Sequence, residues 1–574
     1  MKKSLIFVFL ISTAFQITAQ TPAFDKNRQL GRGINLGNMF EAPSETEWGN
    51  PFQDKYMSMI AGLGFDHVRI PIRWEPADRS MATTPYTISP DFLQRIKHVV
   101  DLARVNKLHA IINMHHHEAL YEDPDGQKER FLNMWDQVAT YFANYSDSLL
   151  FEILNEPHGN LSAVKWNQFA ADALTVIRKT NPSRFVIIGT AEYGGLGGLS
   201  KLQLPEDNRL IVTIHYYNPF HFTHQGASWA GDDAKNWLGT KWQDTESERK
   251  TVQTEFASLV QFSKDHNVPV HIGEFGAYSA ADLQSRKLWT TYLARYFESL
   301  GFSWAYWEFS AGFGIYNRTN DSYIQELVDA LLHNPMSDAT PVNRTEIKKT
   351  LFETTGNMEG WNLGNSSGAS STSKVENGQL SIQIANGGTS AWSVQLRLNN
   401  ILLEKGKNYE VIFRAKSNGS RSISTYIGMN RDPWSSYSGY PTFQMNEAFN
   451  EFTYSFQMQN DSDPQSRVVF DLGNSTQSFE LDYFIINEVS IASAVNTISK
   501  DEPFFYPNPV KEIIYFRNDR NALISLFSLS GRLLIEKEIN SNPQINVGWL
   551  ANGIYLITKK KGNSFQSARL VKIN

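Results

Sequence analysis

The sequence contains no cysteine among its 574 residues. That absence excludes a disulfide framework, a thiolate metal site and a lipid-modified cysteine, so packing alone must stabilise every domain. Strong charge is also missing, because the net charge of -6 and the pI near 6.1 give no electrostatic reason to expect a polyanionic partner. We therefore expect no nucleic-acid partner and an uncharged ligand.

Long apolar runs are scarce. Lys2 and Lys3 precede an apolar run that ends near Ile17, and small residues follow it, which predicts a signal peptide over residues 1–19. No later stretch reaches the roughly 20 apolar residues that a membrane-spanning helix requires. We therefore expect an exported chain with no transmembrane segment.

Aromatic residues are plentiful, at 13% of the chain with 14 Trp and 23 Tyr. Exposed aromatic rings stack on the apolar faces of sugar rings, although most of these rings must fill cores. The chain is also too long for a single hydrophobic core, so two to four domains are expected.

An α/β barrel is predicted for residues 20–335, where short apolar runs alternate with amphipathic segments. Eight such repeats fit a (β/α)8 TIM barrel, because closing a parallel sheet removes its edges and buries both of its faces. The expected strands are 31–38, 66–72, 109–116, 149–156, 185–190, 210–217, 268–275 and 302–308, with helices at 90–107, 128–145, 165–179, 248–265 and 282–300.

The pattern changes to all-β in the C-terminal part of the chain. Residues 345–492 show short alternating segments between Asn, Gly and Ser clusters, which predicts a jelly-roll-like sandwich. Residues 502–574 are long enough only for a small β domain, and 492–501 are typical of a linker. Sandwich strands are expected at 378–384, 393–398, 409–415, 452–456 and 467–472.

Polar residues gather at the predicted strand ends of the barrel. Ligands of such barrels meet the carboxyl ends of the strands, and buried polar groups there need partners, so we expect a site for an uncharged polar ligand. The residues are Asn38, Glu41, Arg69, Arg73, His115, His116, His117, Asn155, Glu156, His215, Tyr216, Tyr217, Asn218, Glu274, Trp307 and Glu308.

Two of these carboxylates, Glu156 and Glu274, end the fourth and seventh strands on opposite sides of the barrel. Glycoside hydrolysis needs such a pair, one to protonate the leaving oxygen and one to attack or to activate water. A gap of about 5 Å would retain the anomeric configuration, and a gap of roughly 6.5–9.5 Å would invert it. We also expect the charge of Glu274 to raise the pKa of Glu156.

Each feature also has a plainer interpretation. Glu156 could cap the following helix, and Glu152 is better explained as a barrel-interior group that pairs with an arginine. The three consecutive histidines could suggest zinc, but successive side chains of a strand point to opposite faces and cannot converge. We therefore expect neither a metal nor a cofactor.

The sequence resembles glycoside hydrolase family 5 over about residues 23–333, particularly its endoglucanase/mannanase branch. The motifs that carry the resemblance are GRGINLGN (31–38), HVRIPIRW (67–74), NMHH (113–116), FEILNEPHGN (151–160), IHYYNPFHFTHQGASW (214–229), IGEFGAY (272–278) and AYWEF (305–309).

The resemblance implies roles for individual residues. Glu156 would be the general acid/base and Glu274 the nucleophile of a retaining enzyme. Asn155 would hold the sugar 2-hydroxyl, and His215 would orient Glu156. Arg69 and Tyr217 would align Glu274 and keep it ionised. The remaining substrate-binding positions would be Asn38, Glu41, His115, His116, His224, Trp229 and Trp307, with loop anchoring as the alternative for Trp229.

Two further resemblances concern the C-terminal half. AWSVQL (391–396), KGKNY (405–409) and FELDY (479–483) are similar to carbohydrate-binding modules of the family 4, 9 and 16 type. The tail motifs FYPNPVK (505–511), ISLFSLSGRLL (524–534) and LANGIYLI (550–557) resemble a type IX secretion sorting domain. Glycan-binding candidates on the sandwich are Trp392, Gln395, Trp434, Tyr437 and Tyr440, with core packing as the alternative.

Together these features predict a secreted or cell-surface, monomeric endo-glycosidase acting on β-1,4-glucans of the cellulose or mixed-linkage type, with glucomannan and mannan as further candidate substrates. The expected partners are the polysaccharide and the type IX secretion machinery. The alternatives are a β-mannanase or xyloglucanase of the same fold, or an inactive surface glycan-binding protein. Glu156 and Glu274 argue against an inactive barrel.

Overall fold

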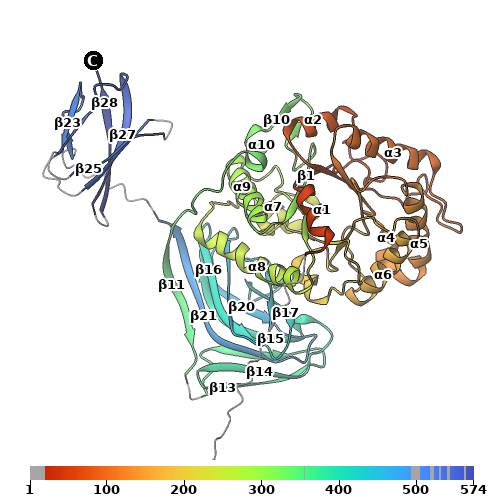
Figure 1. Cartoon of the computed structure of the whole chain (residues 1–574). Coiled ribbons are helices and arrows are strands. Elements are labelled where there is room, and N and C mark those ends of the chain that lie inside the picture. Colours follow the sequence, from red (N-terminus) through yellow and green to blue (C-terminus); the bar gives the residue numbers. More distant parts are fainter. Residues whose placement is uncertain are drawn as a thin grey trace, which may run out of the picture. The chain divides into compact units, whose positions relative to one another are not determined.

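The computed structural model describes residues 20–353, 356–492, 504–516, 522–528, 532–539, 543–561 and 564–574. The predicted signal peptide lies outside these ranges, and so do residues 493–501 of the predicted linker. The described chain divides near residue 490 into two compact units. The first unit contains a barrel and a β-sandwich, and the second is a small β domain (Figure 1).

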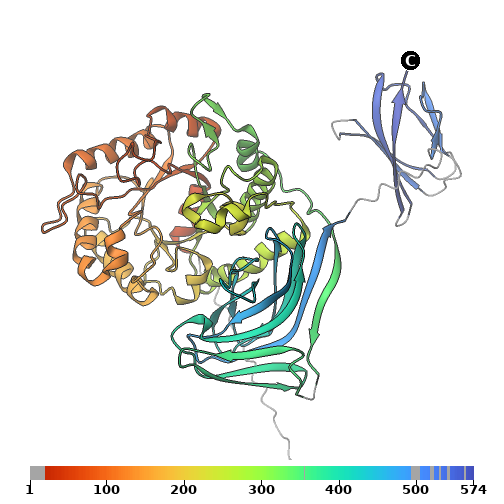
Figure 2. The same cartoon turned by 180° about the vertical axis from the view of Figure 1, so that it is seen from behind.

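A closed barrel of eight parallel strands confirms the predicted fold of the first half of the chain. The strands pair in chain order, and β8 closes the barrel against β1. Helices surround the strands when the chain is seen from behind (Figure 2). The barrel strands are β1 (Arg32–Asn35), β2 (His67–Ile70), β3 (His109–Asn113), β4 (Leu149–Glu152), β5 (Val186–Gly189), β6 (Leu210–His215), β7 (Val270–Phe275) and β8 (Ser303–Tyr306).

The helices begin where the sequence supplies capping residues. Ser89 accepts a hydrogen bond from the N–H of Phe92 at the start of α3, and Thr245 and Glu248 form a capping box on α8. The described α-helices are α1 (Pro22–Leu30), α2 (Lys55–Leu63), α3 (Pro90–Val105), α4 (Glu118–Glu122), α5 (Pro124–Tyr141), α6 (Ala163–Thr180), α7 (Phe220–Thr223), α8 (Glu246–Asp265), α9 (Leu283–Ser299) and α10 (Gln325–Leu332).

Every barrel strand is shorter than predicted, so several of the polar candidates lie in loops. The fourth strand was expected to reach Glu156, but β4 ends at Glu152. The apolar run continues through Ile153 and Leu154, which are fully buried although they follow the strand. The apolar pattern therefore extends past the end of the strand, because the residues that follow are buried as well.

The amino-terminal end of the barrel is closed by α1. Ala23 and Leu30 of this helix pack with Ile111 and Ile211 from the barrel interior. The side chain of Asn27 donates to the carbonyl of the first residue of β7 over 2.9 Å. Because this end is filled, access from solvent is left to the carboxyl ends of the strands.

Two antiparallel sheets form the predicted sandwich. One has the order β13-β14-β21-β16-β19, with β11 paired to β21, and the other has the order β12-β15-β20-β17-β18. Their inner faces share one apolar core. The strands are β11 (Val342–Leu351), β12 (Trp361–Asn365), β13 (Ser370–Glu376), β14 (Gln379–Asn386), β15 (Val394–Leu403), β16 (Asn408–Lys416), β17 (Arg421–Gly428), β18 (Thr442–Met445), β19 (Asn450–Gln457), β20 (Asp463–Asp471) and β21 (Phe479–Ile491).

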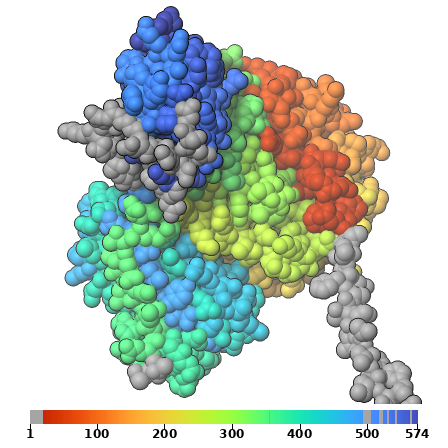
Figure 3. All heavy atoms as spheres, turned by 60° about the vertical axis from the view of Figure 1, so that its left-hand side comes forward, coloured from red at the N-terminus to blue at the C-terminus, as the bar shows by residue number. Residues whose placement is uncertain are grey.

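Helix α8 packs against the sandwich as well as against the barrel. The hydroxyl of Ser247 donates to Glu410 of β16 over 2.6 Å, and the hydroxyls of Thr251 and Ser455 are 3.1 Å apart. Arg344 forms an ion pair of 2.7 Å with the same Glu410. In Figure 3 the surface of the sandwich adjoins the yellow-green surface of the barrel to which α8 belongs.

The second unit is a small β domain with its own apolar core. Its sheets have the orders β22-β23-β26 and β25-β24-β27-β28. No helix in the described ranges is both long and apolar enough to cross a bilayer. The strands are β22 (Phe505–Tyr506), β23 (Ile513–Phe516), β24 (Ala522–Phe527), β25 (Leu533–Ile539), β26 (Gln544–Asn546), β27 (Gly553–Lys561) and β28 (Ser564–Lys572).

Candidate active site

Arg69 is the centre of a buried polar network inside the barrel. Its side chain is fully buried, and its guanidinium forms two hydrogen bonds with Glu152, of 2.6 and 2.8 Å. It also donates to Glu274 over 2.7 Å, to Asn35 over 2.9 Å and to Asn155 over 2.6 Å. Five buried donor–acceptor contacts thus fix one cation below the carboxyl ends of the strands. Asn35 was not among the predicted residues, although its place beside Arg69 follows from the β1–β2 register.

Glu156 and Glu274 converge at the carboxyl end of the barrel. Oxygens of both carboxylates and a ring nitrogen of His215 all lie within 4.8 Å of one another. Nδ1 of His215 lies 2.7 Å from Oε1 of Glu156, and the hydroxyl of Tyr217 donates to Oε2 of Glu274 over 2.8 Å. The side chain of Glu156 is 28% exposed and that of Glu274 only 6%, so Glu156 is the more accessible of the two.

The protonation of this group depends on all its members. Burial raises the pKa of Glu274, an effect that His215, Arg69 and Tyr217 oppose and Glu156 reinforces. Burial also acts to raise the pKa of Glu156, but the hydrogen bond and charge of His215 lower it overall. The raised pKa predicted for Glu156 from the sequence is wrong, because that prediction weighed the charge of Glu274 without the hydrogen bond and charge of His215. Despite its burial, the pKa of His215 is raised by the two carboxylates.

Glu156, His215 and Glu274 are also the one group of three or more described acidic or His residues close enough to hold a metal ion. The guanidinium of Arg69 lies 2.7 Å from Glu274, where it would repel a cation. Tyr217 and His215 already bond to the carboxylates. The donor set therefore suits a proton better than a metal.

Trp307 and the predicted histidines lie together at the same end. The ring of His115 stacks on Trp307 with centroids 5.6 Å apart, and His116 packs edge-on against His115 at 4.7 Å. His116 also meets Trp48 edge-on at 6.0 Å. Trp48 was not predicted, although it is 44% exposed in the loop after β1. An exposed tryptophan in a βα loop is the signal that could have identified it.

Glu41 occupies a different environment from the one expected of a cleft residue. It is fully buried, and its carboxylate accepts hydrogen bonds from the N–H groups of Asn38 and Met39. Burial raises the pKa of Glu41 to about 8. The contacts indicate that Glu41 holds the loop that carries Asn38 in place.

His224 and Trp229 follow β6 along the chain. His224 stacks on Phe220 at 4.1 Å and is only 8% exposed. Trp229 is 61% exposed and meets Tyr278 edge-on at 4.9 Å. Of these two, Trp229 has the face available for a ligand.

Comparisons with known proteins agree with this geometry. The description "Cellulase (glycosyl hydrolase family 5)" matches residues 31–312. A crystal structure of Thermotoga maritima Cel5A in complex with mannotriose is 46% identical, with a TM-score of 0.53, and the match covers 54% of this chain and 99% of that one. The chain belongs to glycosyl hydrolase family 5.

Other relatives match the family 5 barrel as well. Endoglucanase H of Acetivibrio thermocellus is 37% identical over 317 residues, which are 54% of this chain and 33% of that protein. The cellulose synthase subunit Z of Clostridioides difficile is 33% identical, with a TM-score of 0.51, over 53% of this chain and all of that one. This chain thus spans a third of the length of endoglucanase H.

The regions C-terminal to the family 5 barrel match two further families. A carbohydrate binding domain covers residues 346–477, and a secretion system C-terminal sorting domain covers residues 504–573. Both matches agree with the resemblances in the sequence. The chain therefore joins a family 5 barrel to a carbohydrate-binding domain and a sorting domain.

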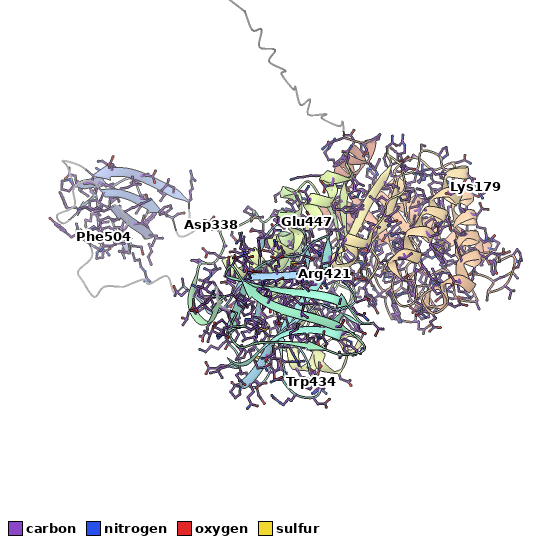
Figure 4. The ribbon with its side chains drawn as sticks, turned by 90° about the horizontal axis from the view of Figure 1, so that it is seen from below. Lys179, Asp338, Arg421, Trp434, Glu447 and Phe504 are labelled. Carbon is purple, nitrogen blue, oxygen red and sulfur yellow. The ribbon has the colours of Figure 1, made fainter. Side chains whose placement is uncertain are left out.

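The structure divides the five glycan-binding candidates of the sandwich. Trp392, Trp434 and Tyr440 are 53%, 47% and 60% exposed. Figure 4 places Trp434 at the outer edge of the sandwich. Gln395 is half-buried and donates to Asp471 over 2.8 Å.

Tyr437 does not belong with these exposed rings, and its prediction was wrong. It is 3% exposed, lies in the apolar core of the sandwich, and donates its hydroxyl to Asp463 over 2.8 Å. Two residues that the sequence did not indicate support the exposed rings: Arg467 lies over Trp434 at 4.5 Å, and Tyr426 meets Tyr440 edge-on at 4.8 Å.

Proposed function

We propose that this protein is a retaining endo-glycosidase that hydrolyses β-1,4-linked glucans of the cellulose or mixed-linkage type. The observation that carries the proposal is the approach of Glu156 and Glu274, whose oxygens lie within 4.8 Å. Carboxyl groups about 5 Å apart suit direct attack on the sugar, because a wider gap is needed to admit the water of an inverting reaction.

In the first step, Glu274 attacks the anomeric carbon while Glu156 protonates the leaving oxygen. Arg69 and Tyr217 each donate to one oxygen of Glu274, which orients the carboxylate and stabilises its negative charge. Asn155, fixed by Arg69 over 2.6 Å, is positioned to bind the sugar hydroxyl beside the reacting carbon. Trp307, backed by His115, supplies an apolar face for the sugar ring.

The acid proton is shared between Glu156 and His215. The pKa of His215 is raised and that of Glu156 is lowered, so the ring stores the proton that the carboxyl must deliver. Substrate that excludes water would favour the neutral pair, with the proton on Glu156. After Glu274 becomes an ester, Glu156 takes a proton from the attacking water and the cycle closes.

A second candidate substrate is β-mannan or glucomannan. The 46% identical Cel5A was solved with mannotriose and also with cellobiose. Glucose and mannose units differ in the orientation of one hydroxyl, and a binding site must hydrogen-bond that hydroxyl to discriminate strongly. Reducing-sugar release from carboxymethyl cellulose, barley β-glucan, glucomannan, galactomannan, xyloglucan and xylan will order these substrates.

The other two domains extend the proposal. Trp392, Trp434 and Tyr440 present exposed rings suited to stacking on a glycan chain. The sorting domain supports export by the type IX machinery to the cell surface or the medium. Retention of the protein on cellulose or glucomannan, and its loss when the three aromatic residues are replaced by Ala, will test the role of the sandwich.

The reaction itself is tested by the stereochemistry of the product. The proton NMR spectrum of fresh hydrolysate should show the β-anomer first, before mutarotation. Glu274→Ala should abolish turnover while oligosaccharide binding is preserved. An α-anomeric first product, or near-normal hydrolysis by E274A, would contradict the mechanism.

A further inference from the structure

The position of Tyr217 depends on contacts outside the sheet. The last backbone hydrogen bond between this segment and β7 runs from the N–H of Tyr216 to the carbonyl of Glu274, over 2.9 Å. Tyr217 follows at once, and its hydroxyl must reach Oε2 of the same Glu274. Since the sheet no longer guides the chain here, side chains must hold the residues around Tyr217.

Glu255 of α8 bonds to both neighbours of Tyr217. Its Oε2 accepts from the hydroxyl of Tyr216 over 2.5 Å, and its Oε1 accepts from the side-chain amide of Asn218 over 3.0 Å. One carboxylate therefore spans the tripeptide 216–218, with Tyr217 between its two attachment points. The bonds cross 39 and 37 positions of sequence, so no local turn provides them.

A role in stability alone does not explain why a carboxyl group is buried at position 255. The residue is 6% exposed, and burial raises its pKa to about 7. No basic side chain in the described part of the chain forms an ion pair with it, so no cation offsets its desolvation. An apolar residue would fill the same space without that cost.

We infer that Glu255 is a positioning residue that aims the hydroxyl of Tyr217 at Glu274 by holding Tyr216 and Asn218. The inference rests on the proposed function, because the contact between Tyr217 and Glu274 matters to catalysis only if Glu274 is the nucleophile. Helix α8 can serve as the support because the sandwich also holds it, through the bond from Ser247 to Glu410.

A double-mutant cycle tests this inference. Glu255→Gln replaces one acceptor oxygen by an N–H₂ group, which must either oppose the amide of Asn218 or force the hydroxyl of Tyr216 to turn and accept. The tripeptide 216–218 is then held in a different geometry, so kcat should fall about 10- to 100-fold with KM little changed. Tyr217→Phe removes the hydroxyl that Glu255 aims, and it should lower kcat by about 100-fold. In the Tyr217→Phe background, Glu255→Gln should then cause less than about a twofold further loss, because coupled residues are not additive.

Glu248, about two turns before Glu255 on the same helix, is a matched control. Glu248 is half-buried, and its desolvation raises its pKa to about 7, but it bonds to Thr245 and Gln243 rather than to the segment of Tyr217. Glu248→Gln should therefore lower the melting temperature without lowering kcat. Tyr216→Phe removes one attachment point and keeps Glu255, so it serves if Glu255→Gln does not fold.

The outcomes separate this inference from the proposed function. If Glu255→Gln lowers kcat equally in the wild-type and Tyr217→Phe backgrounds, the positioning role is overturned. An unchanged kcat in Glu255→Gln, or a change confined to KM, would overturn it as well. An active Glu274→Ala enzyme would overturn the proposed function instead. A kcat loss that appears only while Tyr217 is present supports the inference.

Discussion

Nη1 of Arg69 donates to Oε1 of Glu274 over 2.7 Å, although the two residues are 205 positions apart in the chain. The same guanidinium pairs with Glu152, which is 1% exposed. The contact therefore joins the stability of the barrel interior to the charge state of the proposed nucleophile.

Replacing Arg69 should damage both properties. Arg69→Met would leave two buried carboxylates without their cation, and we expect a loss of about 3–5 kcal/mol in the free energy of unfolding. Urea unfolding measures this, and kcat should fall in parallel. Arg95→Met, at a partly exposed pair with Glu45, should cost at most about 1 kcal/mol. Similar losses in the two variants would contradict the buried network.

The shared proton predicts a specific pH profile. Because the pKa of His215 is raised above the ordinary imidazole value of 6.5, the basic limb of kcat/KM should lie above pH 6.5. His215→Ala leaves Glu156 as the only store of the acid proton, so the basic limb should move to lower pH. A limb that stays in place in this variant would show that His215 does not hold the proton.

Glu41 should make stability depend on pH. Its folded pKa of about 8 exceeds the ordinary value of 4.5, so the folded state binds the proton more tightly. The free energy of unfolding should fall as pH rises from about 4.5 to about 8, with a contribution of up to about 1.4 kcal/mol per pH unit. Glu41→Gln replaces the titrating carboxyl group by a neutral amide. Urea unfolding at pH 5 and pH 8 should show a smaller difference for E41Q than for the wild type, and parallel behaviour would refute the assignment.

Tyr440 and Tyr437 of the sandwich should separate glycan binding from stability. Tyr440→Ala removes an exposed ring and should weaken glycan affinity by roughly 1 kcal/mol, measured by affinity electrophoresis. Tyr437→Phe removes a buried donor from Asp463 and should instead cost about 1–3 kcal/mol of stability. Weakened binding by Y437F with unchanged stability would reverse these roles.

Glu410 should matter to the joint between sandwich and barrel. Glu410→Ala removes the partner of Ser247 and Arg344, and a loss of about 1–3 kcal/mol in the free energy of unfolding is expected. Glu246→Ala is the control, because its contact with Arg344 is 3.8 Å long and half-exposed. Equal melting temperatures for the two variants would show that the joint adds nothing to stability.

Much of this architecture could be predicted from the sequence. Eight apolar runs located the barrel strands, and the residues at their ends included Glu156, Glu274, Arg69 and His215. The predicted pairing of Glu152 with an arginine is present as two hydrogen bonds to Arg69. Long-range periodicity therefore indicated the strands, and the fold brought their ends together.

Other features depended on three-dimensional surroundings that no pattern records. The run through Ile153 and Leu154 is buried like a strand but forms a loop, so the strand end was placed too late. Tyr437 lies between Ser436 and Ser438, yet its ring is buried and its hydroxyl bonds to Asp463. Glu255 lies on an ordinary amphipathic helix, and only its bonds to distant residues reveal its position behind Tyr217.

Because α8 contacts both the barrel and the sandwich, it limits how chimeric proteins can be built from this chain. A barrel cut away after its last helix would expose Ser247 and Thr251, which now bond to Glu410 and Ser455. A foreign module joined in place of the sandwich would need its own acceptor for that helix face. In this chain the unit of exchange is therefore the barrel together with its sandwich.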